Sequence, residues 1–484
     1  MTAAAARLAS LLGAAALLAL LVVSAQRVGS PSVLEWEEGA TVLSADRLRA
    51  GLPLYVEPSL EWAPFPYGPG QPALAAALVS LGLEGLLAAR LSSWLGTLLL
   101  LLGCAGIASS LAGLAGVGGR DRRAVALAAA GWVISGYVAT GAWLDVARPD
   151  ALALGLAAVG MWGALRSSGG TRLVILAVFG TLAVHTKQTV LLPLACAALG
   201  LGGVPLAAGL GAVVLGGYGL GELVTGPWYR FHTLELLAGH GLTGEGLRSI
   251  ATHDLPRLLP LLVAAGLGAS ASGQRPDPGA SRASRRALLG WALGGIAASV
   301  MGRFHPGGVE NVMLPAIAGL APLAAWGVLT GAPGRCALLA LGLALASVDG
   351  ASRGLVPSEG DRAAHERVLG RLERIEGELL APAHPELLRA LGRPAQLHLM
   401  FLLDLSASDA GLEHARRILA ELERRLAEGR YAAAVLPRFP GGADAPLHAL
   451  VARHLPVATE LLAPGELVPV SGAPHRPEIL YTAP

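Results

Sequence analysis

Long, almost uncharged apolar runs fill residues 1–350 and constrain the fold more than any other feature of this chain. A helix that spans a bilayer needs about 20 predominantly apolar residues. Only 14% of the residues are charged, whereas a soluble domain carries about 25%. We therefore predict a mainly α-helical, polytopic transmembrane bundle. The about eleven candidate spans lie at 8–25, 91–116, 124–141, 150–165, 172–185, 189–203, 204–223, 257–273, 286–302, 311–329 and 335–350.

Two details of this assignment stay open. The runs 172–185 and 189–203 are short and could form one bent helix. Val23-Ser24-Ala25 resembles a signal-peptidase site, so residues 1–25 could be cleaved.

Arginine in short loops predicts the orientation. By the positive-inside rule, the loops that contain Arg120–Arg123, Arg166–Arg172 and Arg275–Arg286 face the cytoplasm, as does Arg335. The opposite, extracytoplasmic side then receives the segments 26–90, 142–149, 224–256 and 303–310.

The chain divides into two regions by composition. Residues 1–350 form the predicted bundle, with an outer loop at 26–90 that holds interfacial helices at 40–50 and 71–90. Residues 351–484 carry more charge and read as a small extracytoplasmic α/β domain. Its predicted helices lie at 361–380 and 411–428, and its predicted strands at 396–403, 431–436 and 478–481.

Four polar clusters interrupt the apolar region, and all fall on the predicted outer side. A charge at membrane depth costs several kcal/mol unless it is paired or solvated. The first cluster contains Glu35, Glu37 and Glu38. Neighbouring carboxylates raise each other's pKa, so one could act as a general base, or the three could hold a divalent ion. The alternative is a solvated acidic loop.

The second cluster contains Asp145, Arg148 and Asp150. Asp145 and Arg148 are three residues apart and could pair. Asp150 follows Pro149, which places it in the first turn of a helix, where a carboxylate suits the helix dipole. The alternative to a functional role is helix capping with a structural ion pair.

The third and fourth clusters carry cations. Lys187 is the only lysine of the chain and precedes Gln188; an ammonium there would suit a phosphate group, although a snorkelling lysine is the alternative. The fourth cluster combines Arg303, His305 and a glycine-rich turn with Asn311 in the following run. A short capped loop is the alternative reading of this turn.

Several classes of function find no support in the sequence. It has no basic stripe with interleaved aromatic residues, which excludes nucleic-acid binding. It contains no CxxC, HExxH or P-loop motif. A transporter or lipid flippase is the alternative to an enzyme, but transporters place charges near the bilayer midplane of repeated halves, and no internal repeat is visible.

Seven short motifs, taken in order, carry a family resemblance. The chain resembles the GT-C superfamily of membrane glycosyltransferases, in particular the branch with protein O-mannosyltransferases and the lipid A aminoarabinose transferase. The motifs are Glu38-Gly39, the Gly-x-Pro-Leu-Tyr element 51–55, Tyr67-Gly68-Pro69, Arg90-Leu91, Arg148-Pro149-Asp150, Thr186-Lys187-Gln188 and the run 302–311.

The resemblance implies a function and a location. A sugar would move from a polyprenyl-phosphate donor to an extracytoplasmic acceptor, with inversion, in the inner (plasma) membrane of a bacterium. The acceptor would be a lipid, a glycan or a protein. The closer relatives work without a metal, so no cofactor is expected, although Glu35, Glu37 and Glu38 leave a divalent ion open.

The resemblance also implies roles for particular residues. Glu38 matches the general base best and Glu37 second; the family's base is usually Asp, which leaves the choice between the two open. Lys187 matches the lysine that binds the donor phosphate, and Arg303 and His305 are further phosphate contacts. Supporting or acceptor-binding positions are Tyr67, Asp145, Arg148, Asp150, Gln188 and Asn311.

Overall fold

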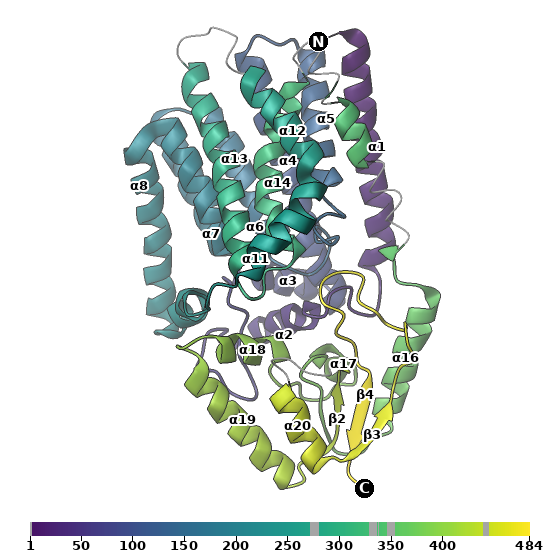
Figure 1. Ribbon diagram of the computed structural model, residues 1–484. Coiled ribbons are helices and arrows are strands. Elements are labelled where there is room, and N and C mark those ends of the chain that lie inside the picture. Colours follow the sequence, from purple (N-terminus) through teal and green to yellow (C-terminus); the bar gives the residue numbers. More distant parts are fainter. Residues whose placement is uncertain (1, 272–279, 329–335, 337, 346–353, 439–444) are drawn as a thin grey trace.

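A helical bundle carries a smaller domain at one of its ends (Figure 1). The computed structural model describes residues 2–271, 280–328, 336, 338–345, 354–438 and 445–484. The N-terminus lies at the far end of the bundle, and the C-terminal domain lies at the opposite end. Between them are two shorter helices, α2 (Glu38–Arg49) and α3 (Gly70–Ser80).

The bundle consists of helices whose composition suits a bilayer. Within the described residues, four helices are long and apolar enough to cross a membrane, and two more are apolar but shorter. Exposed leucines such as Leu98 and Leu102 cover their outer faces, which lipid chains would solvate. The bundle helices are α1 (Ala3–Val28), α4 (Gly85–Leu114), α5 (Gly119–Ser135), α6 (Asp150–Leu165), α7 (Gly169–Val184), α8 (Leu191–Thr225), α12 (Leu255–Ala271), α13 (Ala280–Phe304) and α14 (Leu314–Gly327).

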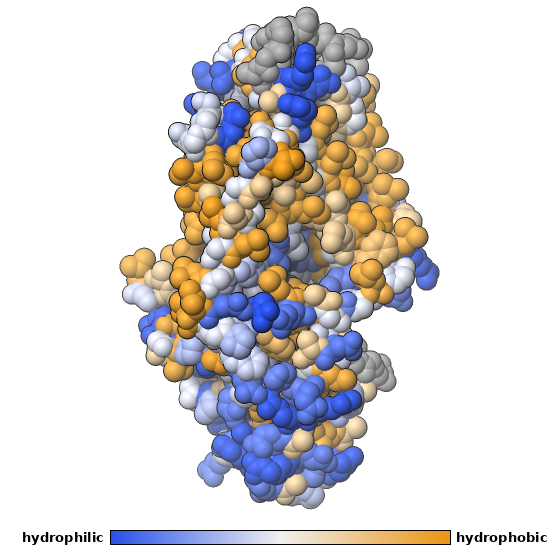
Figure 2. Space-filling view, turned by 90° about the vertical axis from the view of Figure 1, so that its left-hand side faces the viewer, coloured by the Kyte–Doolittle hydropathy of each residue, from blue (hydrophilic) through white to orange (hydrophobic). Residues whose placement is uncertain are grey.

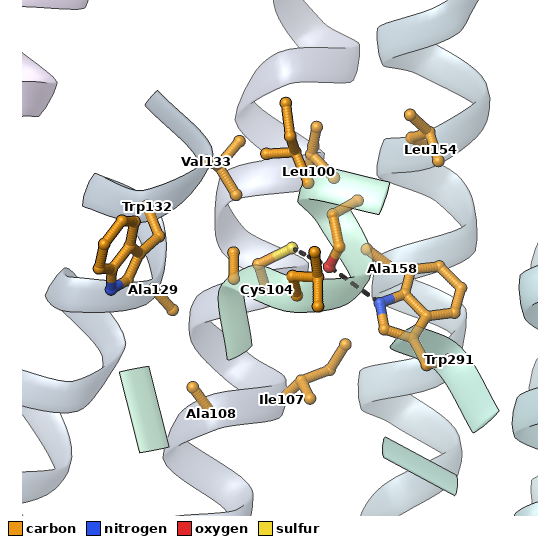
Figure 3. Close-up of a cluster of buried hydrophobic side chains, with 14 of the residues drawn as sticks. Leu100, Cys104, Ile107, Ala108, Ala129, Trp132, Val133, Leu154, Ala158 and Trp291 are labelled. Atoms are coloured by element: carbon orange, nitrogen blue, oxygen red, sulfur yellow. Dashed lines mark hydrogen bonds between the residues drawn. The ribbon is translucent and has the colours of Figure 1, made fainter. Parts of the chain in front are cut away.

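Small residues let the central helices approach closely, as small side chains do in membrane bundles. A Cβ at Gly96 of α4 would lie 2.4 Å from the Cα of Leu152 of α6, so the two backbones touch. Figure 3 shows the packed interior around Cys104 and Trp291. Both side chains donate to the carbonyl of Ala318, at 3.6 Å and 3.0 Å, which satisfies their polar atoms inside an apolar core.

Helix α8 is a hairpin. Gly203 has φ 68° and ψ −162° inside it, a conformation open to glycine but strained for other residues. The half before Gly203 packs on α13, where Gly200 meets Ala287, and the half after it packs on α7, where Gly209 meets Leu173. The two predicted runs 189–203 and 204–223 are therefore separate helical arms.

The outer loops hold short helical turns. After α8 come α9 (Trp228–Arg230), α10 (Leu236–Ala238) and α11 (Glu245–Ser249), with π-helical turns at Phe231–Glu235 and Ile250–Asp254. The 3-10 turns Gln188–Val190 and Glu310–Met313 precede α8 and α14.

The C-terminal domain is a four-stranded sheet with helices around it. The strand order is β1 (Glu378–Leu380), β2 (Tyr431–Leu436), β4 (Ile479–Thr482), β3 (Val457–Glu460). Strands β1 and β2 are parallel, and the other pairs are antiparallel. The helices are α16 (Glu359–Glu373), α17 (Pro385–Ala390), α18 (Leu399–Ala407), α19 (Leu412–Ala427) and α20 (Ala445–His454).

The predicted architecture is confirmed, with corrections at individual elements. The chain is mainly helical, with several apolar candidate spans and a small C-terminal sheet. The interfacial helix expected over 71–90 is instead α3 followed by the start of α4. The runs 172–185 and 189–203 do not form one bent helix, because residues 185–187 turn between α7 and α8. The last span, 335–350, lies only partly within the described residues, and the predicted boundary after 350 lies outside them.

Two elements of the C-terminal domain also differ from expectation. The strand predicted at 396–403 is wrong, because Leu399–Ala407 forms helix α18. The helix expected over 361–380 ends at Glu373, and β1 follows it. An apolar run of this length does not distinguish a buried strand from a buried helix.

Candidate active site

The four polar clusters meet in one cavity of about 590 Å³. It lies where the bundle meets the C-terminal domain, and Figure 2 shows a recess in one face at the level where apolar side chains give way to hydrophilic ones. Its polar and aromatic lining comes from Glu37, Phe65, Tyr67, Trp143, Arg148, Lys187, Gln188, Thr189, His305, Asn311 and Asp404.

A carboxylate–guanidinium pair forms one side of the cavity. Glu37 precedes α2, and its carboxylate accepts a hydrogen bond from Nη1 of Arg148. The guanidinium also lies 4.7 Å from the ring centre of Phe65. Glu35 stands behind the pair, with Oε2 at 3.9 Å from the same Nη1. The aromatic ring and the guanidinium therefore fix the Glu37 carboxylate at the cavity wall.

Burial and charge act strongly on Glu35. Its side chain is fully buried, and burial raises its pKa well above the usual range, as do the charges of Glu37 and Glu38, while Arg148 lowers it. Its Oε1 has no hydrogen-bond partner among the described residues. Glu37, and not Glu35, is therefore the carboxylate that is hydrogen-bonded to Arg148.

An ammonium–carboxylate pair forms a second side. Nζ of Lys187 donates to Oδ1 of Asp150 at 2.7 Å, and the Asn311 amide donates to the same oxygen at 3.2 Å. Trp143 donates to Oδ2 at 3.3 Å. The Lys187 ammonium also lies 4.7 Å from the ring centre of Tyr67. Asp150, in the first turn of α6, thus orients the ammonium toward the cavity.

Two histidines connect the cavity to the C-terminal domain. Nε2 of His305 lies 2.8 Å from Nδ1 of His240, and Nε2 of His240 lies 2.9 Å from the backbone carbonyl of Asp404. A carbonyl only accepts, so His240 donates to it and accepts from His305. Burial, then the nearby His240 and Lys187, lowers the pKa of His305 to about 4. His305 is therefore a neutral hydrogen-bonding group at pH 7.

The remaining walls are apolar and reach the outside of the bundle. Leu191 and Leu192 of α8 and Ala298 and Met301 of α13 line the cavity. Leu191 and Met301 are exposed on the bundle surface. The cavity therefore joins a polar interior to a surface that acyl or prenyl chains would cover.

Glu38, the first choice for a general base, does not line this cavity. It is fully buried, and Arg90 binds both of its oxygens, with Nη2 at 2.7 Å from Oε2. The backbone amides of Leu34 and Ala147 donate to the same carboxylate, at 2.7 Å and 2.8 Å. With its acceptor sites occupied and no access to a substrate, Glu38 holds the outer loop to α4.

Two further predicted residues also have structural partners. Asp145 pairs with Arg27, at 3.0 Å, rather than with Arg148. Arg303 is held by both oxygens of Asp254, at 2.8 Å and 2.5 Å. Neither Asp145 nor Arg303 lines the cavity. Asp145 and Arg148, which their spacing would have allowed to pair, therefore have different partners, and the Arg303 guanidinium is not available to a phosphate in this arrangement.

Gln188 lines the cavity but is also anchored. Its amide nitrogen donates to the carbonyls of Pro66, at 2.9 Å, and Thr233, at 2.8 Å. It thereby ties the turn that carries Lys187 to the loop that carries Tyr67.

The three glutamates of the first cluster do not converge on one point. Glu38 faces Arg90 while Glu37 faces Arg148. Within the part of the chain that the structure describes, no group of three or more His, Cys, Asp or Glu residues could hold a metal ion. Independence from metal stays a prediction.

Sequence reasoning missed several lining residues. Asp404 lies on α18 and lines the cavity, more than 350 residues from Glu37 in the sequence. The available signal was an acid directly after the apolar run 399–403, the same kind of signal that singled out Lys187. Phe65, which also lines the cavity, carried no comparable signal.

Comparison with solved structures gives the fold a precedent. Two crystal structures of ArnT from Cupriavidus metallidurans superpose on 97% of this chain and 97% of their own. The apo form gives a TM-score of 0.59 at 12% identity, and the form bound to undecaprenyl phosphate gives 0.57 at 14%. The chain has the ArnT fold. ArnT is a lipid A aminoarabinose transferase of the GT-C class, so the predicted GT-C resemblance is confirmed at the level of the fold.

The likeness to ArnT is one of shape rather than of sequence. No protein-family model matches this chain, and no curated protein matches it. The ArnT likeness extends over both the bundle and the C-terminal domain, because it covers nearly the whole length of each chain. The two regions described above therefore belong to one shared architecture.

Proposed function

We propose that this protein is a membrane glycosyltransferase that moves a sugar from a polyprenyl phosphate to an extracytoplasmic acceptor with inversion. One observation carries the proposal: a single cavity holds a carboxylate, Glu37, and an ammonium, Lys187, beside apolar walls that reach the bundle surface. An ArnT structure of the same fold binds undecaprenyl phosphate, which fits a cavity with a cation and a lipid-facing wall.

The lining residues suggest a division of labour. Lys187 would bind the donor phosphate, with Asn311 and the backbone of the turn at Gly307 and Gly308 beside it. Asp150 would keep the ammonium oriented. The prenyl chain would leave along Leu191 and Met301 toward the lipid. His305, neutral at pH 7, would accept a hydrogen bond at Nδ1 without adding charge.

Glu37 would act as the general base in place of Glu38. Its carboxylate would take the proton of the acceptor hydroxyl or amine while the acceptor oxygen or nitrogen bonds to the anomeric carbon. The bond from that carbon to the phosphate oxygen breaks, and the electron pair leaves with the polyprenyl phosphate. Lys187 would stabilise the charge that develops on this leaving group. The acceptor would enter on the face opposite the phosphate, which inverts the anomeric centre.

The Lys187 assignment can be tested with purified protein in nanodiscs and a labelled undecaprenyl-phosphate sugar. We expect Lys187→Ala to lower donor kcat/KM at least about tenfold, because a charge-assisted contact contributes about 1.5–3 kcal/mol. Arg120→Ala, at the opposite end of the bundle, is the control and should turn over like the wild type. Equal turnover of both variants would defeat the phosphate-binding role.

The same assay separates transfer from transport. A glycosyltransferase releases undecaprenyl phosphate without its sugar, whereas a flippase moves the intact lipid between leaflets. If the protein moves the intact donor between leaflets and forms no sugar-free lipid, it is a transporter and the enzyme proposal is wrong.

A further inference from the structure

Asp404 is a buried carboxyl in the cavity that the chemistry above does not use. It lies on α18 of the C-terminal domain and is 6% exposed. The structure gives its side chain no hydrogen-bond or ion-pair partner among the residues it describes. A buried carboxyl without a partner costs free energy that a folded protein normally avoids. Such a group in a cavity wall is suited to a ligand that supplies the missing donor.

Contacts at both ends of α18 hold this helix in place, and they thereby fix the position of Asp404 in the cavity wall. The backbone carbonyl of Asp404 accepts from His240, at 2.9 Å. His240 also bridges to Ser408 through an isolated antiparallel β-bridge. At the other end of the helix, Nε2 of His398 contacts the carbonyl of Trp36, at 3.2 Å. Both ends of α18 are thus held to loops of the bundle.

The charged groups of the cavity determine which part of a ligand can lie next to Asp404. The charged groups that act most on its carboxyl are Glu37, which raises its pKa, and Arg148, which lowers it; burial is the largest cause, and the pKa is raised well above its usual range. Arg148 is already bound to Glu37. The Glu37 carboxylate beside it repels a phosphate, while the ammonium of Lys187 attracts one.

A sugar phosphate matches this polarity. The phosphate group would lie at Lys187, and the hydroxyl or amino groups of the sugar would lie toward Glu37 and Asp404. The ring of Phe65 lies against Arg148, and the ring of Tyr67 lies against both Arg148 and Lys187. Both rings line the cavity wall, which gives the apolar face of a sugar ring a surface to pack against.

On the basis of the proposed function, we propose that Asp404 accepts a hydrogen bond from a hydroxyl or amino group of the donor's sugar. The C-terminal domain thereby supplies a residue that selects the sugar, and the bundle supplies the residues that bind the phosphate. Asp404 contacts the sugar and takes no part in proton transfer.

Equilibrium binding of three lipids to the full chain in nanodiscs tests this division. The probes are undecaprenyl phosphate without a sugar and the same lipid carrying either a neutral hexose or an amino sugar. We expect Asp404→Asn to weaken at least one sugar-bearing lipid about tenfold and to leave the sugar-free lipid within about twofold. Retained binding of the sugar-free lipid also shows that the variant is folded. Asp409→Asn, which alters an exposed acid just after α18, is the matched control and should change neither.

The failures of the two proposals are distinguishable. Asp404→Asn that leaves every sugar-bearing lipid unchanged, or weakens all lipids equally, would overturn the role of Asp404 while leaving Lys187 untouched. Lys187→Ala that binds the sugar-free lipid as tightly as the wild type would remove the proposed phosphate site, and the assignment of Asp404 with it.

Discussion

Two adjacent glutamates, Glu37 and Glu38, meet opposite environments. The Glu38 carboxylate accepts from Arg90 and two backbone amides in a fully buried site. The Glu37 carboxylate faces a cavity and shares one guanidinium with Glu35. Because neighbouring residues of a turn point in different directions, one glutamate is free to meet a substrate while the other ties the outer loop to α4.

Replacing each glutamate in turn by uncharged glutamine should separate the catalytic role of Glu37 from the structural role of Glu38. Removing one partner of a buried ion pair costs about 3–5 kcal/mol, so Glu38→Gln should lower the temperature of unfolding in detergent by many degrees. Glu37→Gln should lower the unfolding temperature less than Glu38→Gln, because Glu35 stays beside Arg148, and it should lose sugar transfer. Thermal unfolding and single-turnover transfer on the same preparations measure both effects.

A surface pair provides the control for that comparison. Arg424→Gln removes exposed pairs with Glu421 and Glu428, and exposed pairs contribute about 0–1 kcal/mol. Full transfer by Glu37→Gln, or a stable and inactive Glu38→Gln, would reverse the assignment of the base.

At the scale of elements, the loop of Tyr67 is built onto the turn that carries Lys187. A Cβ at Gly68 would lie 1.9 Å from the carbonyl oxygen of His185, and the amide of Gly70 donates to that same oxygen at 3.2 Å. The backbones are in contact there, so neither chain can make room by rotating a side chain. This contact sets the 4.7 Å between the Lys187 ammonium and the Tyr67 ring.

Gly68→Ala should therefore weaken binding of undecaprenyl phosphate, because the loop must move away from the turn. We expect a loss of about tenfold or more, since overpacking against backbone costs about 1–3 kcal/mol. Gly118→Ala is the control, because a Cβ there meets nothing within 4 Å. Lipid binding by Gly68→Ala equal to that of the control would show that this contact does not position the site.

The elements also show what the sequence could and could not predict. Apolar periodicity and length located the helices of the bundle, and each of the four polar clusters supplied residues to the cavity. Ion pairs between residues far apart in the sequence were not predictable. Arg90 lies 52 residues from Glu38, and no local sequence pattern links Arg303 to Asp254. Asp404 was missed because its apolar run was read as a strand, which would have pointed alternate residues to opposite faces.

In the molecule as a whole, the two ends of the bundle carry different polar groups. Arg120 and the arginines near 166–172 lie at the end of the bundle that holds the N-terminus, where Arg120 contacts the carbonyl of Ala3. The polar cavity and the C-terminal domain lie at the other end. By the positive-inside rule, we propose that the cavity and the domain lie on the extracytoplasmic face.

Single cysteines test that orientation in intact bacterial spheroplasts. The background carries Cys196→Ser and Cys336→Ser, because Cys196 is partly exposed and Cys336 is exposed, whereas Cys104 is buried. A cysteine in place of Glu413, exposed on α19, should react with a membrane-impermeant maleimide added outside. A cysteine in place of Arg120 should react only after the membrane is permeabilised. The opposite pattern would place the cavity in the cytoplasm, where an acceptor of the cell envelope could not reach Glu37, and the proposed transfer would have to take place on the other face of the membrane.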